Sequence, residues 1–192
     1  MITRLREPDP ASPTERTPGR GEGLALFAQA VERHVFPDAL SDLSVLDVGG
    51  ADGWLWAFLS RWQRPRAPRA YWCLDRRLSD WWRNILADAH ALPFRDASVD
   101  VVVSKQTLPH FRDPGQACRE MVRVARRLVV VRQEWPVAHL EGGDPQYEPV
   151  GWVGHSRVRI DGPEDVLLAL RHPDWVVDYD GVDFVARRME NP

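Results

Sequence analysis

Segments with hydrophobic residues at helical spacing alternate along the chain with short hydrophobic runs typical of β-strands. Residues 23–40 carry apolar side chains at helical spacing, which predicts an amphipathic helix built on Leu24, Phe27, Val31 and Val35. Short β-rich runs bounded by turn residues then recur and predict strands at 44–49, 70–75, 85–88, 99–105 and 127–133. Helical patterns separate most of these runs, at 53–62, 78–84 and 113–126. This alternation predicts βαβ units and a mostly parallel sheet.

The end of the chain has a different pattern. Residues 134–160 show no clear period and contain several glycines, whereas 161–173 predict a short helix. Two further strands flank Asp180-Gly181, a dipeptide favoured in tight hairpins. We therefore expect an α/β, doubly wound, Rossmann-like sheet of seven strands, five of them parallel and the last two forming an antiparallel pair.

Length and composition predict one domain with a tail. Residues 1–21 are rich in Pro, Arg, Glu and Thr and are predicted to form a mobile tail, which leaves 22–192 as the folded domain. The net charge of −3 and the pI near 6.1 argue against a general polyanion binder. No signal peptide or long apolar run is visible, and Cys73 and Cys118 are too few for a disulfide framework. These features predict a soluble, cytoplasmic protein that does not associate with membranes.

The first predicted strand ends in a glycine-rich turn that leads into a helix, within "SVLDVGGADGWLWAFLSRW". Such a turn is typical of nucleotide binding, because glycine lets the backbone approach a ligand closely. A P-loop requires GK[ST], which is absent, and a dinucleotide fingerprint requires a small residue where Trp54 stands. The pattern that remains is Gly49-x-Ala51-x-Gly53.

"LDVGGADG" resembles the first motif of the class I methyltransferases that use S-adenosylmethionine (SAM). Asp75 ends the second predicted strand 22 residues after Gly53, and "ADAHALPFRDASVDVVVSKQTLPHFRDP" is similar to a later run of the same family. The resemblance is to the type 11, or UbiE-like, subgroup. It is strong over 44–133 and weak over 161–188.

The resemblance implies a role for each matching residue. Gly49, Ala51 and Gly53 would wall the methionine part of SAM, with Asp47 beneath the loop, and Asp75 would hold the ribose. Asp88 and Ala89 would lie at the adenine, which Leu92, Pro93 and Phe94 would help to shape. Ser104, Lys105 and Gln106 would face the methyl donor. For the acceptor we expect contacts from Gln106, Trp135 and Trp152, with 134–160 on the substrate side.

The resemblance implies methyl transfer from SAM to an O, N or C nucleophile of a small molecule, with His110 as the candidate general base. Several alternatives stay open. His110 could equally serve a surface or packing role, packing is the simpler role for Trp135 and Trp152, and Asp47 could cap the next helix or brace the loop. The protein could be a non-catalytic SAM-binding regulator or partner subunit, since Ala51 replaces a glycine and only 13 residues separate Asp75 from Asp88.

Nucleic-acid methylation and metal binding have little support in the sequence. Nucleic-acid methylation is supported only by the arginine-rich loop at 61–69, and no His, Cys or Asp cluster has metal-binding spacing. Ala51 suits its position only if its φ is negative, because a positive φ would cost about 1–2 kcal/mol.

Overall fold

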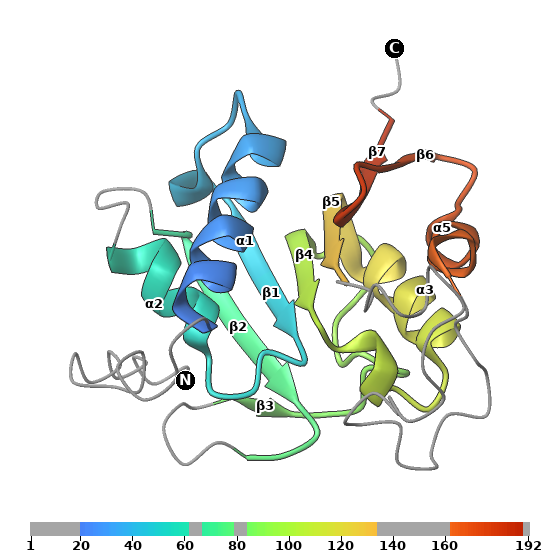
Figure 1. The fold of residues 1–192 in the computed structure, drawn as a ribbon, viewed down its shortest axis with the longest axis horizontal. Coiled ribbons are helices and arrows are strands. Elements are labelled where there is room, and N and C mark those ends of the chain that lie inside the picture. The colour runs from blue at the N-terminus through green and yellow to red at the C-terminus, as the bar shows by residue number, and fades with distance from the viewer. Residues whose placement is uncertain (1–19, 62–66, 79–83, 134–161, 190–192) are drawn as a thin grey trace, which may run out of the picture.

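A computed structural model describes residues 20–61, 67–78, 84–133 and 162–189 (Figure 1). Its centre is a seven-stranded sheet in the order β3-β2-β1-β4-β5-β7-β6. The strands are β1 (Ser44–Val48), β2 (Ala70–Asp75), β3 (Ile85–Leu86), β4 (Val99–Lys105), β5 (Ala125–Arg132), β6 (Trp175–Tyr179) and β7 (Asp183–Arg188). Strands β1 to β5 pair in parallel, whereas β7 is antiparallel to both β5 and β6. The predicted fold class is confirmed.

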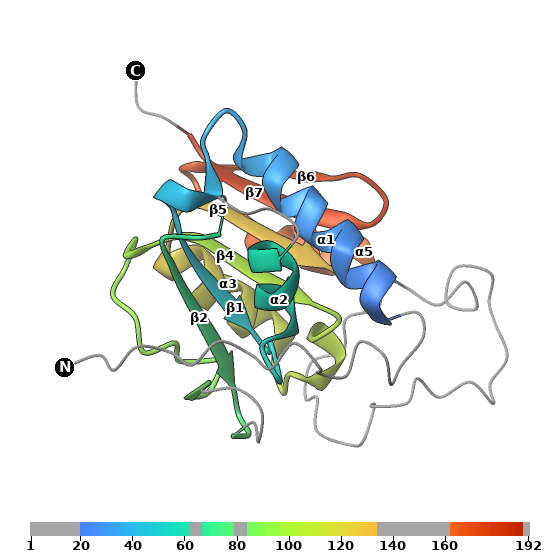
Figure 2. The same ribbon diagram turned by 90° about the vertical axis from the view of Figure 1, so that its left-hand side faces the viewer.

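Helices cover both faces of the sheet (Figures 1 and 2). On one face lie α1 (Arg20–Val35) and α2 (Trp54–Arg61), and on the other lie α3 (Pro114–Val124) and α5 (Pro163–Leu170). Two short 3₁₀ turns, η2 (Leu40–Asp42) and η3 (Leu108–His110), precede β1 and follow β4. Because helices cover both faces, the connecting loops lie at the ends of the strands.

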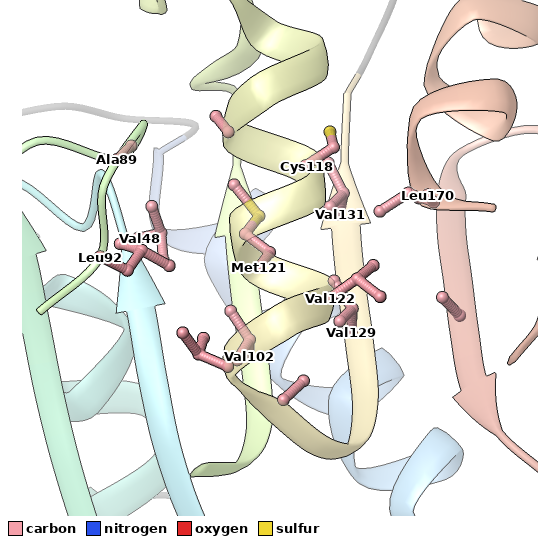
Figure 3. Packing of buried hydrophobic residues seen from close by; sticks show 14 of the residues in the cluster. Val48, Ala89, Leu92, Val102, Cys118, Met121, Val122, Val129, Val131 and Leu170 are labelled. Atoms are coloured by element: carbon pink, nitrogen blue, oxygen red, sulfur yellow. The ribbon is translucent and has the colours of Figure 1, made fainter. Parts of the chain in front are cut away.

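Successive side chains of the central strands point to opposite faces of the sheet, and this creates two separate hydrophobic cores, one on each face. In β4, Val101 and Val103 pack with α1 and α2, while Val102 packs with α3. Figure 3 shows Met121 of α3 in the second core, with Val102 of β4 and Val129 of β5 close to the helix. Both faces of β1 and of nearly all of β4 are therefore buried, as is typical of central strands in a parallel sheet.

Most element boundaries match the sequence pattern, with some differences. Asp113 is the N-cap of α3, since its Oδ1 accepts a hydrogen bond from the Gln116 amide at 2.9 Å. Gly181 occupies the hairpin turn with φ +97°. Helix α1 spans Arg20–Val35, so it begins three residues earlier and ends five residues earlier than predicted, and β3 is only two residues long. The predicted helix at 113–126 ends at Val124, because β5 begins directly at Ala125.

Candidate functional site

The carboxyl ends of β1, β2 and β4 meet at one edge of the sheet. Asp47 of β1 pairs with Cys73 of β2 and with Val103 of β4, so these three parallel strands end side by side. The glycine-rich turn between β1 and α2 lies at this edge (Figure 1). In doubly wound folds this edge is where ligands bind, where the strand order reverses.

Three residues of the turn have left-handed backbone conformations: Gly49 (φ +76°), Ala51 (φ +47°) and Gly53 (φ +71°). At Gly49 a side chain is also excluded, since a Cβ there would lie 2.5 Å from Cγ2 of Thr107. The amides of Gly49 and Gly50 both donate to the Leu74 carbonyl, at 2.7 and 3.3 Å. The turn is thus pressed onto the ends of β2 and β4.

Ala51 does not have the negative φ that an unstrained alanine would need at this position. The turn is fixed on both sides by its contacts with the strand ends, so Ala51 adopts the left-handed conformation that its neighbours impose. For a residue with a Cβ this costs about 1–2 kcal/mol.

Asp75 lies at the end of β2, beside the turn, as the spacing predicted. Its Oδ2 accepts a hydrogen bond from the Ala51 amide at 3.2 Å, and its Oδ1 accepts one from the Arg77 amide at 3.0 Å. The side chain is half-buried, so it remains accessible from the edge of the sheet. An accessible carboxylate tied to the loop backbone is suited to accept hydrogen bonds from a diol.

Asp47 lies beneath the turn and is only 4% exposed. Its Oδ2 accepts a hydrogen bond from the Tyr71 hydroxyl at 2.5 Å. Burial raises the pKa of Asp47 to about 6, the Tyr71 hydrogen bond opposes that rise, and the charge of Asp75 adds to it. A Cβ at Gly50 would lie 2.5 Å from Asp47 Oδ2, so carboxylate and turn are in direct contact. This placement fits the loop-bracing alternative.

The segment after β3 carries the predicted adenine residues. Asp88 is exposed, while Ala89 and Leu92 are buried near Val48 of β1 (Figure 3). The Asp88 Oδ1 accepts hydrogen bonds from the His90 amide at 2.9 Å and from the His90 ring. These bonds, the amide bond first, lower the pKa of Asp88, so it is a carboxylate at neutral pH.

Side chains on one face of α3 form hydrogen bonds with the backbone of residues 90–94. Gln116 donates to the His90 carbonyl, Glu120 accepts from the Leu92 amide at 2.8 Å, and Arg123 donates to the Leu92 and Phe94 carbonyls at 3.0 and 2.9 Å. Arg123 also pairs with Glu120 and Asp96, at 2.6 Å each. Positions 116, 120 and 123 share one helix face by their spacing. Residues 87–98 contain no helix or strand, and side chains on this face of α3 supply several of the hydrogen bonds that hold the segment.

Residues at the end of β4 and just after it form hydrogen bonds with neighbouring strands and loops. Ser104 is fully buried; its hydroxyl donates to the Val48 carbonyl at 2.9 Å and contacts the hydroxyl of Thr107. Gln106 has φ +55°, and its side-chain oxygen accepts from Gln133 at 2.8 Å. His110 is exposed at the end of η3. Trp135 and Trp152 lie outside the described residues.

The structure brings Gly49, Ala51, Gly53 and Asp75 together at one turn, with Asp47 directly below. Sequence reasoning missed Tyr71, Thr107 and His90, which hold this region through contacts distant in the chain. The spacing of Gln116, Glu120 and Arg123 was a usable signal, since it marks a polar helix face. Nothing in the sequence signalled the other three.

One cluster among the described residues has ligand atoms close enough for a metal. His34, Asp180 and Asp183 lie within 4.8 Å of one another. However, Arg132 donates to both oxygens of Asp183, at 2.7 and 2.6 Å, and Arg187 contacts Nδ1 of His34 at 2.7 Å. Arg33 reaches Asp180 at 3.5 Å. Because three arginines contact these groups, the cluster is better described as a network of ion pairs and hydrogen bonds.

Comparison with known proteins gives a family match over the site. A family model described as a methyltransferase domain matches residues 46–130, which run from β1 into β5 and include every predicted cofactor residue.

Solved structures with low sequence identity share the fold. A chain from a Haloferax volcanii complex between the Trm112 methyltransferase activator and a methyltransferase has 16% identity and a TM-score of 0.61, with 90% of this chain and 95% of that chain covered. A Methanococcus maripaludis SAM-dependent methyltransferase has 15% identity, TM-score 0.58 and coverage of 90% and 87%. The magnesium protoporphyrin IX methyltransferase of Synechocystis, crystallised with S-adenosylhomocysteine, has 14% identity, TM-score 0.58 and coverage of 87% and 84%.

The family match supports a methyltransferase domain over residues 46–130, for which SAM is the cofactor, and the solved structures show that the chain shares the fold of class I methyltransferases. The type 11 name agrees with the matched domain, and the UbiE-like subgroup stays a prediction. No helix within the described residues is long and apolar enough to cross a membrane.

The residues present fit SAM. The turn has left-handed backbone at three alternate positions, and an accessible carboxylate stands beside it at the end of β2. A second carboxylate, Asp88, is exposed at the end of β3 with buried apolar residues following it. These two acceptors match the donors of an adenosine, which are the ribose hydroxyls and the amino group of the base.

Proposed function

We propose that this protein binds SAM across the carboxyl ends of β1, β2 and β3 and transfers its methyl group to an O, N or C nucleophile of a small molecule. The observation that carries the proposal is the hydrogen bond between Asp75 and the Ala51 amide, which joins the accessible acid to the left-handed turn. The sulfonium of SAM supplies an activated methyl group, so the protein has mainly to bind and orient the reactants.

Each part of the site has a proposed role. The Gly49–Gly53 turn brings backbone close to the methionine part, and Asp75 accepts hydrogen bonds from the ribose hydroxyls. Asp88 accepts one from the adenine amino group, while Ala89 and Leu92 exclude water from the ring. Ser104 acts indirectly, because its buried hydroxyl fixes the end of β4 to the end of β1.

The acceptor side is proposed from the residues that follow β4. Gln106 presents a half-buried amide there, and His110 is a candidate base on an exposed turn. A base is needed only if the nucleophile carries a proton. Trp135 and Trp152 stay predicted acceptor contacts, as does the role of 134–160.

Calorimetric titration with S-adenosylhomocysteine tests cofactor binding. The Asp75→Ala variant should bind more weakly by about 1–3 kcal/mol, because charge-assisted hydrogen bonds are lost. Asp174→Ala is the control, since Asp174 is an exposed acid beside β6. Equal affinity in Asp75→Ala and the control would remove Asp75 from the site, and binding of NADH without SAM would contradict the proposal.

A second function is favoured by one observation. Ala51 has a left-handed backbone and carries a methyl group where the family motif has glycine. This difference is compatible with a SAM-binding regulator or partner subunit that does not catalyse transfer. Transfer of labelled methyl from SAM to a metabolite pool separates the two functions. Label in a product supports the enzyme, and binding without any labelled product supports the regulator. Unchanged transfer by His110→Ala would leave the enzyme but exclude His110 as its base.

A protein partner is a further part of the proposal. The similar Haloferax volcanii chain is described in complex with an activator, which supports a search for a small activator of this protein. Methyl transfer that appears only when a Trm112-like protein is added would establish such a dependence.

A further inference from the structure

We infer that His90 is a positioning residue that fixes the carboxylate of Asp88, and that it thereby makes the site selective for a purine carrying an amino group. The inference rests on the proposed binding of SAM and concerns the adenine end of that site. It is carried by the contacts of the His90 ring, which sequence comparison with the methyltransferase motifs did not assign.

The contacts of the ring fix its tautomer. Nε2 of His90 accepts a hydrogen bond from the Asp113 amide at 2.9 Å, so this nitrogen carries no hydrogen in the neutral ring. The hydrogen therefore lies on Nδ1, which contacts Oδ1 of Asp88. His90 thus donates to Asp88 while it accepts from the first turn of α3.

The ring is also held firmly in place. Its side chain is only 10% exposed, although the Asp88 side chain beside it is 57% exposed. Phe111 packs against the ring edge-to-face, with centroids 6.0 Å apart, and Gln116 donates to the His90 carbonyl at 3.4 Å. A buried, well-packed donor can hold an exposed carboxylate that would otherwise rotate freely in water.

The two oxygens of Asp88 are therefore not equivalent. Oδ1 accepts from both the amide and the ring of His90, so its hydrogen-bonding capacity is used. Within the described part of the chain, Oδ2 is recorded only in a long ion pair with Arg112, at 3.9 Å. This leaves Oδ2 as the acceptor for a ligand donor. An amino group satisfies it, whereas a carbonyl oxygen at the same place would be repelled.

Two conservative variants distinguish the contribution of Nδ1 of His90 from that of Nε2. His90→Asn places an amide N–H near the position of Nδ1 and keeps the donor to Asp88, but it loses the acceptor for the Asp113 amide. His90→Gln places an oxygen near the position of Nε2 and keeps that acceptor, but it loses the donor to Asp88. A purely structural role through α3 would make His90→Asn the more damaging variant, whereas the positioning role makes His90→Gln the more damaging one for selectivity.

The measurement is the ratio of affinities for S-adenosylhomocysteine and its 6-oxo analogue, S-inosylhomocysteine, by calorimetry. The wild type should prefer the amino compound, His90→Asn should keep that preference within about twofold, and His90→Gln should reduce it about tenfold, as expected for one charge-assisted hydrogen bond. Asp88→Asn should reduce it at least as much. Thermal unfolding of each variant checks that the fold is retained.

Each result decides between the hypotheses. No preference in the wild type, an unchanged preference in His90→Gln, or equal losses in His90→Asn and His90→Gln would overturn the inference alone. Failure of the wild type to bind either compound would instead overturn the proposed function, and the inference with it.

Discussion

Ala51 has a strained backbone conformation and lies in the turn that we propose to bind SAM. Its φ of +47° costs about 1–2 kcal/mol, whereas glycine at this position would lose about 0.5–1 kcal/mol in chain entropy. Ala51→Gly should therefore raise the free energy of unfolding by about 0.5–1 kcal/mol in urea denaturation. Ala25→Gly, within α1, is the matched control and should lower it by about 1 kcal/mol. A loss in both variants would show that position 51 is not strained.

Asp47 gives the protein a specific dependence on pH. Because its pKa is raised from 3.8 to about 6 in the folded state, the native protein keeps a proton there that the unfolded chain has lost. The free energy of unfolding should thus fall by about 3 kcal/mol as pH rises from about 4 to about 6, and this contribution should be flat above that range.

The Asp47→Asn variant tests this assignment, since its amide oxygen can still accept from Tyr71. Relative to the wild type, it should gain about 3 kcal/mol between pH 4 and pH 8 in denaturant titrations. Asp178→Asn, at an exposed acid of β6, should keep the wild-type slope. If Asp47→Asn follows the wild type across this range, Asp47 is not the titrating group.

At the scale of elements, α3 acts as a clamp for the segment after β3. Arg123 donates to two carbonyls of that segment and pairs with Asp96 and Glu120. Arg123→Lys keeps the charge but cannot make these bonds together, so it should lower the free energy of unfolding by about 2 kcal/mol. It should also speed hydrogen exchange at residues 92–97.

Arg119→Lys is the control for this prediction, because it lies on the same helix. Arg119 is exposed and its recorded hydrogen bonds are with Gln116. Its replacement should change stability by less than about 0.5 kcal/mol. Equal effects in both variants would mean that the clamp contributes little.

The elements themselves were largely predictable, and their contacts were less so. Apolar runs and turn residues located the strands, and Asp113 with Pro114 located the start of α3, because these signals are local. Asp75 was found from its spacing to the glycine turn. The conformation of Ala51 was not predictable, since it depends on contacts with strand ends that are distant in sequence. The pairings of Asp47 with Tyr71 and of His90 with Asp113 arise in the same way, across 24 and 23 residues.

For the molecule as a whole, the buried pair of Arg132 and Asp183 joins the parallel part of the sheet to β7. Both side chains are nearly inaccessible, and the two hydrogen bonds measure 2.7 and 2.6 Å. Asp183→Asn should lower the free energy of unfolding by about 3–5 kcal/mol, because it leaves a buried guanidinium uncompensated. Asp178→Asn, from the exposed pair with Arg187, should cost less than about 1 kcal/mol.

The double variant Arg132→Met/Asp183→Leu checks that explanation. It removes both charges, so it should be much more stable than Asp183→Asn alone. Equal losses in the single and double variants would attribute the cost to packing.

The position of β7 between β5 and β6 has a consequence for biosynthesis. A ribosome delivers β5 well before β7, so β5 is first an open edge with its valines and the Arg132 guanidinium lacking the partners that β7 brings. Such an edge is a template for pairing with other chains. A nascent chain that stalls or is cut before Asp183 should therefore aggregate or recruit chaperones, while the last residues of β7 close the sheet and end that exposure.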